Sequence, residues 1–373
     1  MRRKPCRSSP SSSSASTRLK LSGAYHTRSE ALGLSLTAHG PHLSKSWMSL
    51  IPGSTRQFID ELKPSASWLL ELPTLTRIKI GKAYRWHFTG SLVLNNLVTA
   101  GDVKLKAKQA IITIALDLGP GSSFPMLDGQ FGVTRLNWKG RSADPLVGDI
   151  TANSSTHIIT IDHINGIVAG GKLTGNIRIH TGKNASYAVA CQLHGSQLAG
   201  LLTAPANNVG AKGIQTSTGI VDASLMLNAT MGKNPTRQGS GQLIIHKASI
   251  YDVPMAMGLM QIVTLRLPIS SDFKHADVRY VIGNNVVRFN PISLSSPGVN
   301  LVGEGSLNLK TTDINLRLLT QSPHGTRVPL LGFLFGLARS QLLELRVSGT
   351  MAHPVIVPVP LRFLAWPFIG FGQ

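Results

Sequence analysis

The stretch from residue 298 to residue 321 alternates between apolar and polar side chains, and the alternation changes phase once. On either side of the polar run 310–313 the apolar residues are Val299, Leu301, Leu307 and Leu309, then Ile314, Leu316 and Leu318. A period of two sorts side chains onto the two faces of an extended strand. A short polar turn between two such strands resets their register. The stretch therefore predicts a β-hairpin with one apolar face.

The same alternation recurs from about residue 75 onward, with turn residues between the segments. Glycine is abundant, with 37 residues, and only 14% of the chain is charged, which favours sheet over helix bundle. Lys104, Lys106 and Lys108 alternate with apolar neighbours, so their ammonium groups should point away from the apolar side. The segments predicted as strands are 91–97, 103–109, 112–118, 157–180, 223–229, 241–246, 278–282 and 285–294. The expected fold class is mainly β.

Helical signals are few and short. Ser54 with Gln57 matches a capping box, which predicts a helix at 54–62 that Pro64 should end. Other short helices are expected at 196–202, 253–263 and 328–338. Residues 1–45 are rich in Ser, Arg, His and Gly without a sustained period, which predicts a disordered basic tail.

The charge balance is strongly basic. Lysine and arginine number 37 against 17 acidic residues, a formal net charge of +20, which attracts nucleic acid, anionic lipid or an acidic polymer. Nucleic-acid binders interleave basic residues with exposed aromatics or carry a recognisable reading module. The basic residues here are scattered singly along strand-like segments, so no nucleic-acid partner is expected.

Signatures of catalysis are missing from the sequence. It contains no nucleophile elbow, no phosphate loop and no H-E-x-x-H zinc motif. The glycines of GEGSLN (303–308) lie between strand signals and predict a bend or bulge. His157 and His163 on one extended strand would lie roughly 20 Å apart, too far to share an ion. Two cysteines, Cys6 and Cys191, make neither a disulfide framework nor a zinc site. The chain is therefore expected not to be an enzyme and to hold no cofactor or metal.

No membrane signal is visible either. The basic start lacks the apolar run of about 7 to 15 residues that a signal peptide needs. The longest apolar stretches, 328–338 and 363–372, are shorter than the roughly 20 residues that span a bilayer. The sequence thus shows neither a signal nor an anchor.

Strands with one apolar face leave two architectures open. Two sheets could cover each other as a sandwich. Alternatively, a curved sheet could line a groove that acyl chains complete. The candidate groove-lining residues are Leu225, Leu227, Leu243, Ile245, Val287, Phe289, Leu301, Leu307, Leu309, Ile314, Leu316 and Leu318.

The order and spacing of several segments resemble a known family. These are GSGQLIIHKASIYDVPMAMGLMQIV, the run from LRLPISSDF to the hairpin NLKTTDINLRL, and a closing strand with Val347, Gly349, Thr350 and Pro354. Upstream, INGIVAGGKLTGNIRI with HGSQLAGLL continues the pattern. Over roughly residues 140–361 the chain resembles the AsmA-like C-terminal region of the AsmA/TamB family of bacterial envelope proteins.

This resemblance implies a long, curved antiparallel sheet that forms a hydrophobic groove, with a few short helices. It implies a membrane-associated periplasmic protein that assists phospholipid transport between inner and outer membranes or outer-membrane biogenesis, and it carries no catalytic residues. Family members have an N-terminal transmembrane anchor, which this chain does not show. Phospholipid is the expected ligand, together with a membrane surface or an inner-membrane partner that supplies the anchor.

The organisation expected from sequence and resemblance has four parts: a tail at 1–45, a short helical segment at 46–72, an N-terminal β-groove portion at 73–205 and an AsmA-like C-terminal β region with short helices at 206–373. An alternative function of another class stays open. The chain could be a structural or adhesin-like β-scaffold that binds proteins or acidic polymers through its basic outer face.

Overall fold

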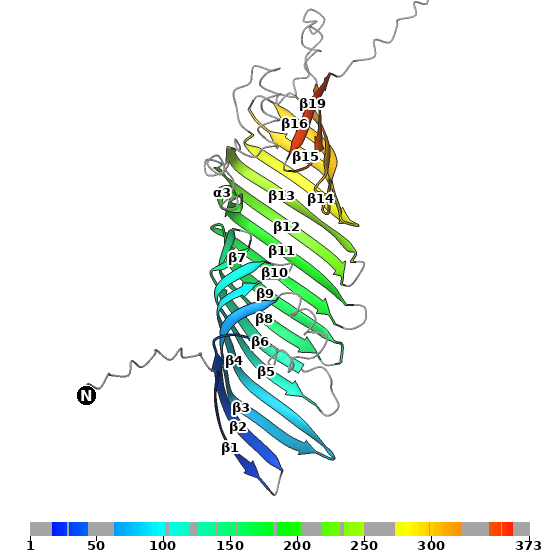
Figure 1. Cartoon of the computed structure of the whole chain (residues 1–373). Helices are drawn as coiled ribbons and strands as arrows, with labels where there is room; N and C mark the ends of the chain where they lie inside the picture. Colours follow the sequence, from blue (N-terminus) through cyan, green and yellow to red (C-terminus); the bar gives the residue numbers. More distant parts are fainter. Residues whose placement is uncertain are drawn as a thin grey trace, which may run out of the picture. The chain divides into compact units, whose positions relative to one another are not determined.

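The structure is a computed structural model. It describes residues 17–27, 30–43, 63–100, 104–119, 126–138, 140–153, 155–181, 185–202, 218–231, 235–249, 273–297, 299–321, 343–351 and 353–360. These residues form nineteen strands of one antiparallel sheet and one short helix (Figure 1). The predicted mainly β fold class is confirmed, and the described strands do not divide into the two stacked sheets of a sandwich.

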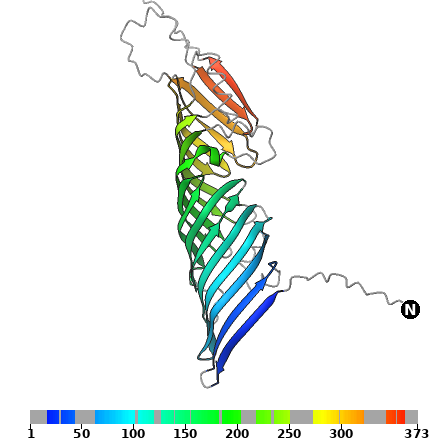
Figure 2. The same ribbon diagram turned by 90° about the vertical axis from the view of Figure 1, so that its left-hand side faces the viewer.

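The chain divides into two compact units, which are described separately. Unit 1 comprises Met1–Leu136 with Asp149–His157, and unit 2 comprises Asn137–Gly148 with Ile158–Gln373. Within each unit the strands follow one another side by side in both views (Figures 1 and 2).

Unit 1 is a meander in which each strand pairs with the next along the chain, from β1 to β6. The longest hairpin closes at Gly81-Lys82, where Ile80 pairs with Ala83 and Gly81 has a φ of 62°. A two-residue hairpin turn requires positive φ, which glycine adopts without strain. The strands are β1 (Arg18–His26), β2 (Ala31–Gly40), β3 (Pro64–Ile80), β4 (Ala83–Thr99), β5 (Leu105–Leu118) and β6 (Met126–Thr134). β7 (Leu136–Trp138) and β8 (Arg141–Asn153) contain residues of both units.

Two expectations for the N-terminal part are wrong. The predicted tail at 1–45 contains the antiparallel pair β1 and β2, because Leu32, Leu34 and Leu36 alternate with small or polar residues and give β2 an apolar side. The predicted helical segment at 46–72 is wrong for residues 64–72, which belong to β3. Pro64 is the first residue of that strand, a position that tolerates proline. The capped helix predicted at 54–62 lies outside the described residues.

Unit 2 is also a meander, in which each strand from β9 to β19 pairs with the next. The strands predicted at 91–97, 223–229, 241–246, 278–282 and 285–294 are confirmed, apart from Asn285 in a turn. The segment 157–180 forms two strands with a turn at 169–170, and residues 105–109 of the predicted 103–109 belong with 112–118 to one strand, β5. The helix predicted at 196–202 is shorter, α3 (Leu198–Leu201). The helices predicted at 253–263 and 328–338 lie outside the described residues. The strands are β9 (Ile158–Val168), β10 (Gly171–His180), β11 (Ser186–Gln197), β12 (Thr218–Thr230), β13 (Arg237–Ser249), β14 (His275–Gly283), β15 (Val286–Ser295), β16 (Asn300–Asn308), β17 (Ile314–Gln321), β18 (Leu343–Gly349) and β19 (Pro354–Pro360).

The hairpin predicted at 298–321 is confirmed as β16 and β17. Leu307 pairs with Ile314, so the change of phase keeps both apolar sets on one face. The turn is held by Asn308, whose side-chain oxygen accepts hydrogen bonds from the Lys310 N–H at 2.9 Å and the Thr311 N–H at 3.3 Å. The glycines of GEGSLN lie within β16, and the irregularity at this level is in the partner strand β15, between Phe289 and Ile292.

Two hydrophobic clusters stabilise unit 2. The larger one is formed by the inward face of the last strands and by Phe273 and Val299, which precede β14 and β16. Its other buried members are Ile292, Leu301, Ile314, Leu316, Leu318, Leu345 and Val347. The smaller cluster joins α3 to β12 and β13 through Leu198, Val221 and Ala248.

Candidate functional site

The apolar face of the sheet is the main candidate site, and in unit 2 one cross-strand row defines it. Residues directly opposite each other on antiparallel strands project to the same face. The row takes one residue from each of β9 to β19, and none of them carries a charge. Its members are Ile164, Gly175, Cys191, Leu225, Gly241, Tyr280, Phe289, Gly305, Leu316, Val347 and Ile356. The face is therefore apolar across the whole unit.

Burial changes along this face. At the C-terminal end Leu316 is 4% exposed and Val347 is 1% exposed, because both belong to the larger hydrophobic cluster. On β10 to β12, Ile177, Val189 and Leu227 are only partly buried. The apolar face is thus closed in the last strands and partly open to solvent in the earlier ones.

The sequence-predicted lining residues fall into four groups on this face. Leu301, Ile314, Leu316 and Leu318 lie in the larger cluster, with Phe289 packed against it and Val287 buried nearby. Leu243 and Ile245 pack against the smaller cluster. Leu225, Leu227 and Leu307 are partly buried on the same face. Leu309 is apart from the others, since it follows β16 in the turn and is 42% exposed.

Unit 1 has an apolar face of its own, which the candidate list from the sequence misses. Two cross-strand rows run from β1 to β6, and their members are apolar or glycine. They are Leu19, Ala38, Leu70, Leu92, Ile112 and Phe131, and Gly23, Leu34, Leu75, Phe88, Leu116 and Leu127. Most of these side chains are partly buried, so this face is also partly open. The period-two signal in 66–72 and 30–38 would have found it.

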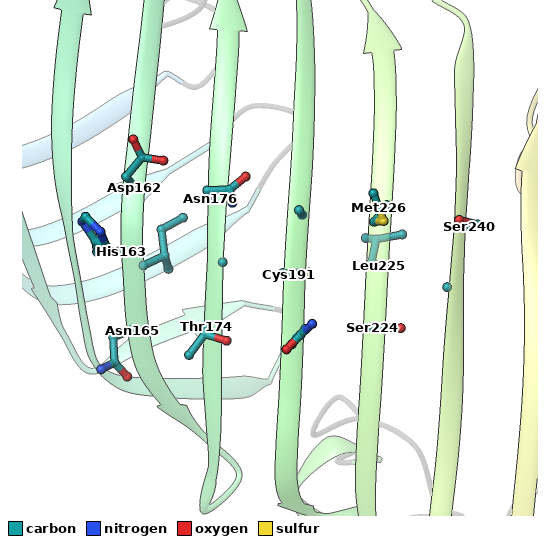
Figure 3. A pocket seen from close by; sticks show the side chains of 15 residues that line it. Asp162, His163, Asn165, Thr174, Asn176, Cys191, Ser224, Leu225, Met226 and Ser240 are labelled. Carbon is teal, nitrogen blue, oxygen red and sulfur yellow. The ribbon is translucent and has the colours of Figure 1, made fainter.

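A groove of about 750 Å³ lies across β9 to β13 in unit 2 (Figure 3). Its side chains come from two rows: Thr174, Gln192 and Ser224 on one side, and Asn176, Ala190, Met226 and Ser240 on the other. Ile164, Gly175, Cys191, Leu225 and Gly241 of the apolar row also line the groove, whereas Leu173 and Ile177 do not. The polar side chains of the groove lie on the face opposite the apolar one. At its β9 end a bulge opposite Asn176 places His163 at a φ of 51°.

On the same polar face Asp222 is bound by three groups. Its Oδ1 accepts hydrogen bonds from the Gly195 N–H at 2.9 Å and from His194 Nδ1 at 2.6 Å, and its Oδ2 lies 3.2 Å from His246 Nε2. The Gly195 hydrogen bond, helped by the two imidazoles, holds the pKa of Asp222 below its ordinary value. Within the described residues no group of three or more His, Cys, Asp or Glu side chains is placed to hold a metal ion. The arrangement ties β11, β12 and β13 together.

Two titratable side chains in the cross-strand row from β9 to β19 have a raised pKa and so keep their protons to a higher pH than usual. Burial raises the pKa of the Cys191 thiol, and burial also raises the pKa of the Tyr280 hydroxyl. A protonated thiol is a poor nucleophile. The Tyr280 hydroxyl donates a hydrogen bond to the Ser224 carbonyl oxygen at 2.8 Å, so the ring lies across Gly241. Both residues are suited to packing rather than to nucleophilic chemistry.

Comparison with known proteins finds no match among family models, curated proteins or solved structures. In the part of the chain that the structure describes, no helix is long and apolar enough to cross a bilayer.

Proposed function

We propose that the apolar face is a non-enzymatic surface that accommodates the acyl chains of phospholipids. In this proposal the protein belongs to the periplasmic, membrane-associated envelope of a bacterium with two membranes, where it assists phospholipid transport or outer-membrane biogenesis. The observation that carries the proposal is the set of charge-free rows that cross β1 to β6 in unit 1 and β9 to β13 in unit 2 and are partly open to solvent.

Partial exposure of so many aligned apolar side chains supports a ligand that is itself apolar. A contiguous apolar patch larger than a few hundred Å² is uncommon on a soluble protein surface and points to a binding site. Each Å² that an acyl chain covers contributes about 25 cal/mol. In β15 to β18 the apolar side chains are buried in the larger hydrophobic cluster and stabilise the fold. In this proposal lipid therefore binds the partly open face of β1 to β6 and of β9 to β13.

The basic charge of the chain supports contact with an anionic membrane surface. Lys104, Lys106 and Lys108 are exposed at the start of β5, whereas Ala107 between them is buried. Basic side chains near an anionic bilayer each contribute about 1 kcal/mol of attraction. The net charge of +20 also attracts the whole chain to an anionic surface.

The groove across β9 to β13 favours a second candidate function. Its amide and hydroxyl side chains, on a face that also carries basic residues, suit a scaffold that binds proteins or an acidic polymer. In that case the apolar face would hold no lipid.

Extraction of the purified full chain with organic solvent separates the two functions. Lipid transport predicts that phospholipid is recovered in a reproducible ratio to protein, measured by mass spectrometry and total phosphorus. The variants Ile177→Glu and Arg178→Glu form a matched pair, because these neighbours lie on opposite faces of β10. Loss of lipid from the first and retention by the second supports the proposal. Lipid-free wild-type protein in repeated preparations would favour the scaffold function.

A further inference from the structure

The apolar face of unit 1 ends in a cluster of charged and aromatic side chains. Beyond the row that contains Leu75 and Phe88, the next row on the same face pairs Arg77 with Trp86, and the row after that pairs Lys79 with Tyr84. The Arg77 guanidinium carbon lies 4.5 Å from the centre of the Tyr84 ring and 5.7 Å from that of Trp86. These contacts fix an arginine at the border of an apolar surface.

Arg77 has a donor that nothing in the described residues satisfies. Its Nε atom is buried and has no hydrogen-bond partner. Buried polar atoms are almost always paired, so an orphaned donor on a charged side chain calls for an explanation. The Tyr84 and Trp86 rings contact the guanidinium, and neither supplies an acceptor for this N–H group.

The acid in the cluster is already engaged. Glu30 accepts hydrogen bonds from the Lys79 ammonium and, at 3.1 Å, from the Tyr84 hydroxyl. Arg77 and Lys79 carry two positive charges against the one negative charge of Glu30, so these three side chains sum to +1. A phosphate diester carries one negative charge and offers the oxygen acceptors that a guanidinium binds best.

We propose that Arg77 binds the phosphate of a phospholipid headgroup whose acyl chain lies along the apolar face of β3, β4 and β5. This inference rests on the proposed function and names where the polar end of the ligand sits. Trp and Tyr are the side chains favoured at headgroup level in membranes, which fits Trp86 and Tyr84. The engaged Glu30 holds Lys79 and Tyr84 beside the phosphate.

The apolar face has the length that one acyl chain needs. Along β4 the apolar face runs from Phe88 to Leu94, which is six residue steps, or about 20 Å at ~3.3 Å per residue. Half of a bilayer core of ~30 Å is about 15 Å. A chain that starts at Arg77 is therefore covered over its whole length by Phe88, Leu92 and their cross-strand neighbours.

The test uses the full chain and two lipids with identical acyl chains, phosphatidylcholine and diacylglycerol. The wild-type protein is expected to bind phosphatidylcholine about tenfold more tightly, the effect of one charge-assisted hydrogen bond. Arg77→Gln should remove this preference. Arg85→Gln is the matched control, because Arg85 is exposed on the opposite face of the same hairpin, and it should keep the preference.

A measurement on wild-type protein keeps the test independent of folding of the variant. The Nε–H resonance of Arg77 should shift on addition of phosphatidylcholine and stay in place with diacylglycerol, while that of Arg85 stays in place with both. Inorganic phosphate alone should not shift the Arg77 resonance at millimolar concentration. A shift with inorganic phosphate equal to that with the lipid would assign a free-anion site and overturn the headgroup inference.

The remaining outcomes separate this inference from the function on which it rests. Equal binding of both lipids by wild-type protein, with no shift at Arg77, overturns the headgroup site and leaves an acyl-chain face intact. Binding of neither lipid overturns both.

Discussion

The Leu316 side chain lies over Gly305, its direct cross-strand partner, and fills the space that a side chain at position 305 would occupy. Glycine at 305 therefore lets β17 place a buried leucine against the backbone of β16. The same pair lies in the row that crosses unit 2 from β9 to β19. It sits in the part of the row that is closed by the larger hydrophobic cluster.

Gly305→Ala should lower the free energy of unfolding by about 1–3 kcal/mol, because the added methyl group collides with Leu316 and with the Asn315 carbonyl. Gly283→Ala is the control. The space beside Gly283 holds only the end of the Arg288 side chain at 3.7 Å, so that change should stay within about 0.5 kcal/mol. Urea denaturation of both variants measures the difference. Equal stability of the two would mean that Leu316 does not occupy this space.

Leu316→Asp should destabilise unit 2 by several kcal/mol, since a carboxylate would be buried without a partner at a site that is 4% exposed. Leu227→Asp, on the partly open face of β12, should leave the fold in place and reduce the bound lipid. Circular dichroism in urea and lipid phosphorus per protein give the two readouts. A stably folded Leu316→Asp protein would show that the last strands are open rather than closed.

The hairpin at 298–321 could be predicted because alternation alone places Leu307 and Ile314 on one face. Alternation does not say what covers that face, so nothing in the sequence separated buried Leu316 from partly open Leu227. β2 was missed although Leu32, Leu34 and Leu36 alternate with Gly33 and Ser35, because this short pattern lies in a segment rich in Ser, Arg, His and Gly.

The candidate site was harder to predict than the fold. Arg77 follows Leu75 by two residues and therefore lies on the apolar face of β3. In the sequence, a charged residue at such a position makes the apolar alternation less regular and does not indicate a binding site. The proposed role of Arg77 in headgroup binding depends on Tyr84 and Trp86, which the turn at Gly81 places opposite Lys79 and Arg77.

The bonds to Asp222 make the stability of unit 2 depend on pH. The folded-state pKa of this carboxyl lies below its ordinary value of 3.8. The stabilisation is therefore fully present above about pH 3.8 and is lost as the pH falls through the folded pKa. Asp222→Asn should be less stable than wild type at pH 5, and the gap should close on acidification toward pH ~2. Unfolding curves that stay parallel across this range would contradict the account.

Lys104, which precedes β5, and Lys106 and Lys108 within β5 should attract anionic vesicles. Replacing Lys104, Lys106 and Lys108 with glutamine should weaken binding by up to about 3 kcal/mol at low salt, and ~0.5 M salt should remove most of the difference. The control replaces three exposed lysines that are scattered over unit 2, Lys172, Lys247 and Lys310, and should have a smaller effect. Vesicle co-sedimentation measures both. Wild-type binding that salt does not change would exclude a screened electrostatic contact.

The most direct test of the central claim is photo-crosslinking at two adjacent positions of β12 in living cells. Leu227 lies on the apolar face, and Asn228 is exposed on the opposite face. A photoreactive residue at 227 should capture phospholipid, detected by mass spectrometry of the purified adduct, whereas the same residue at 228 should not. Equal lipid capture at both positions, or none at 227, would contradict the proposal that the apolar face accommodates lipid.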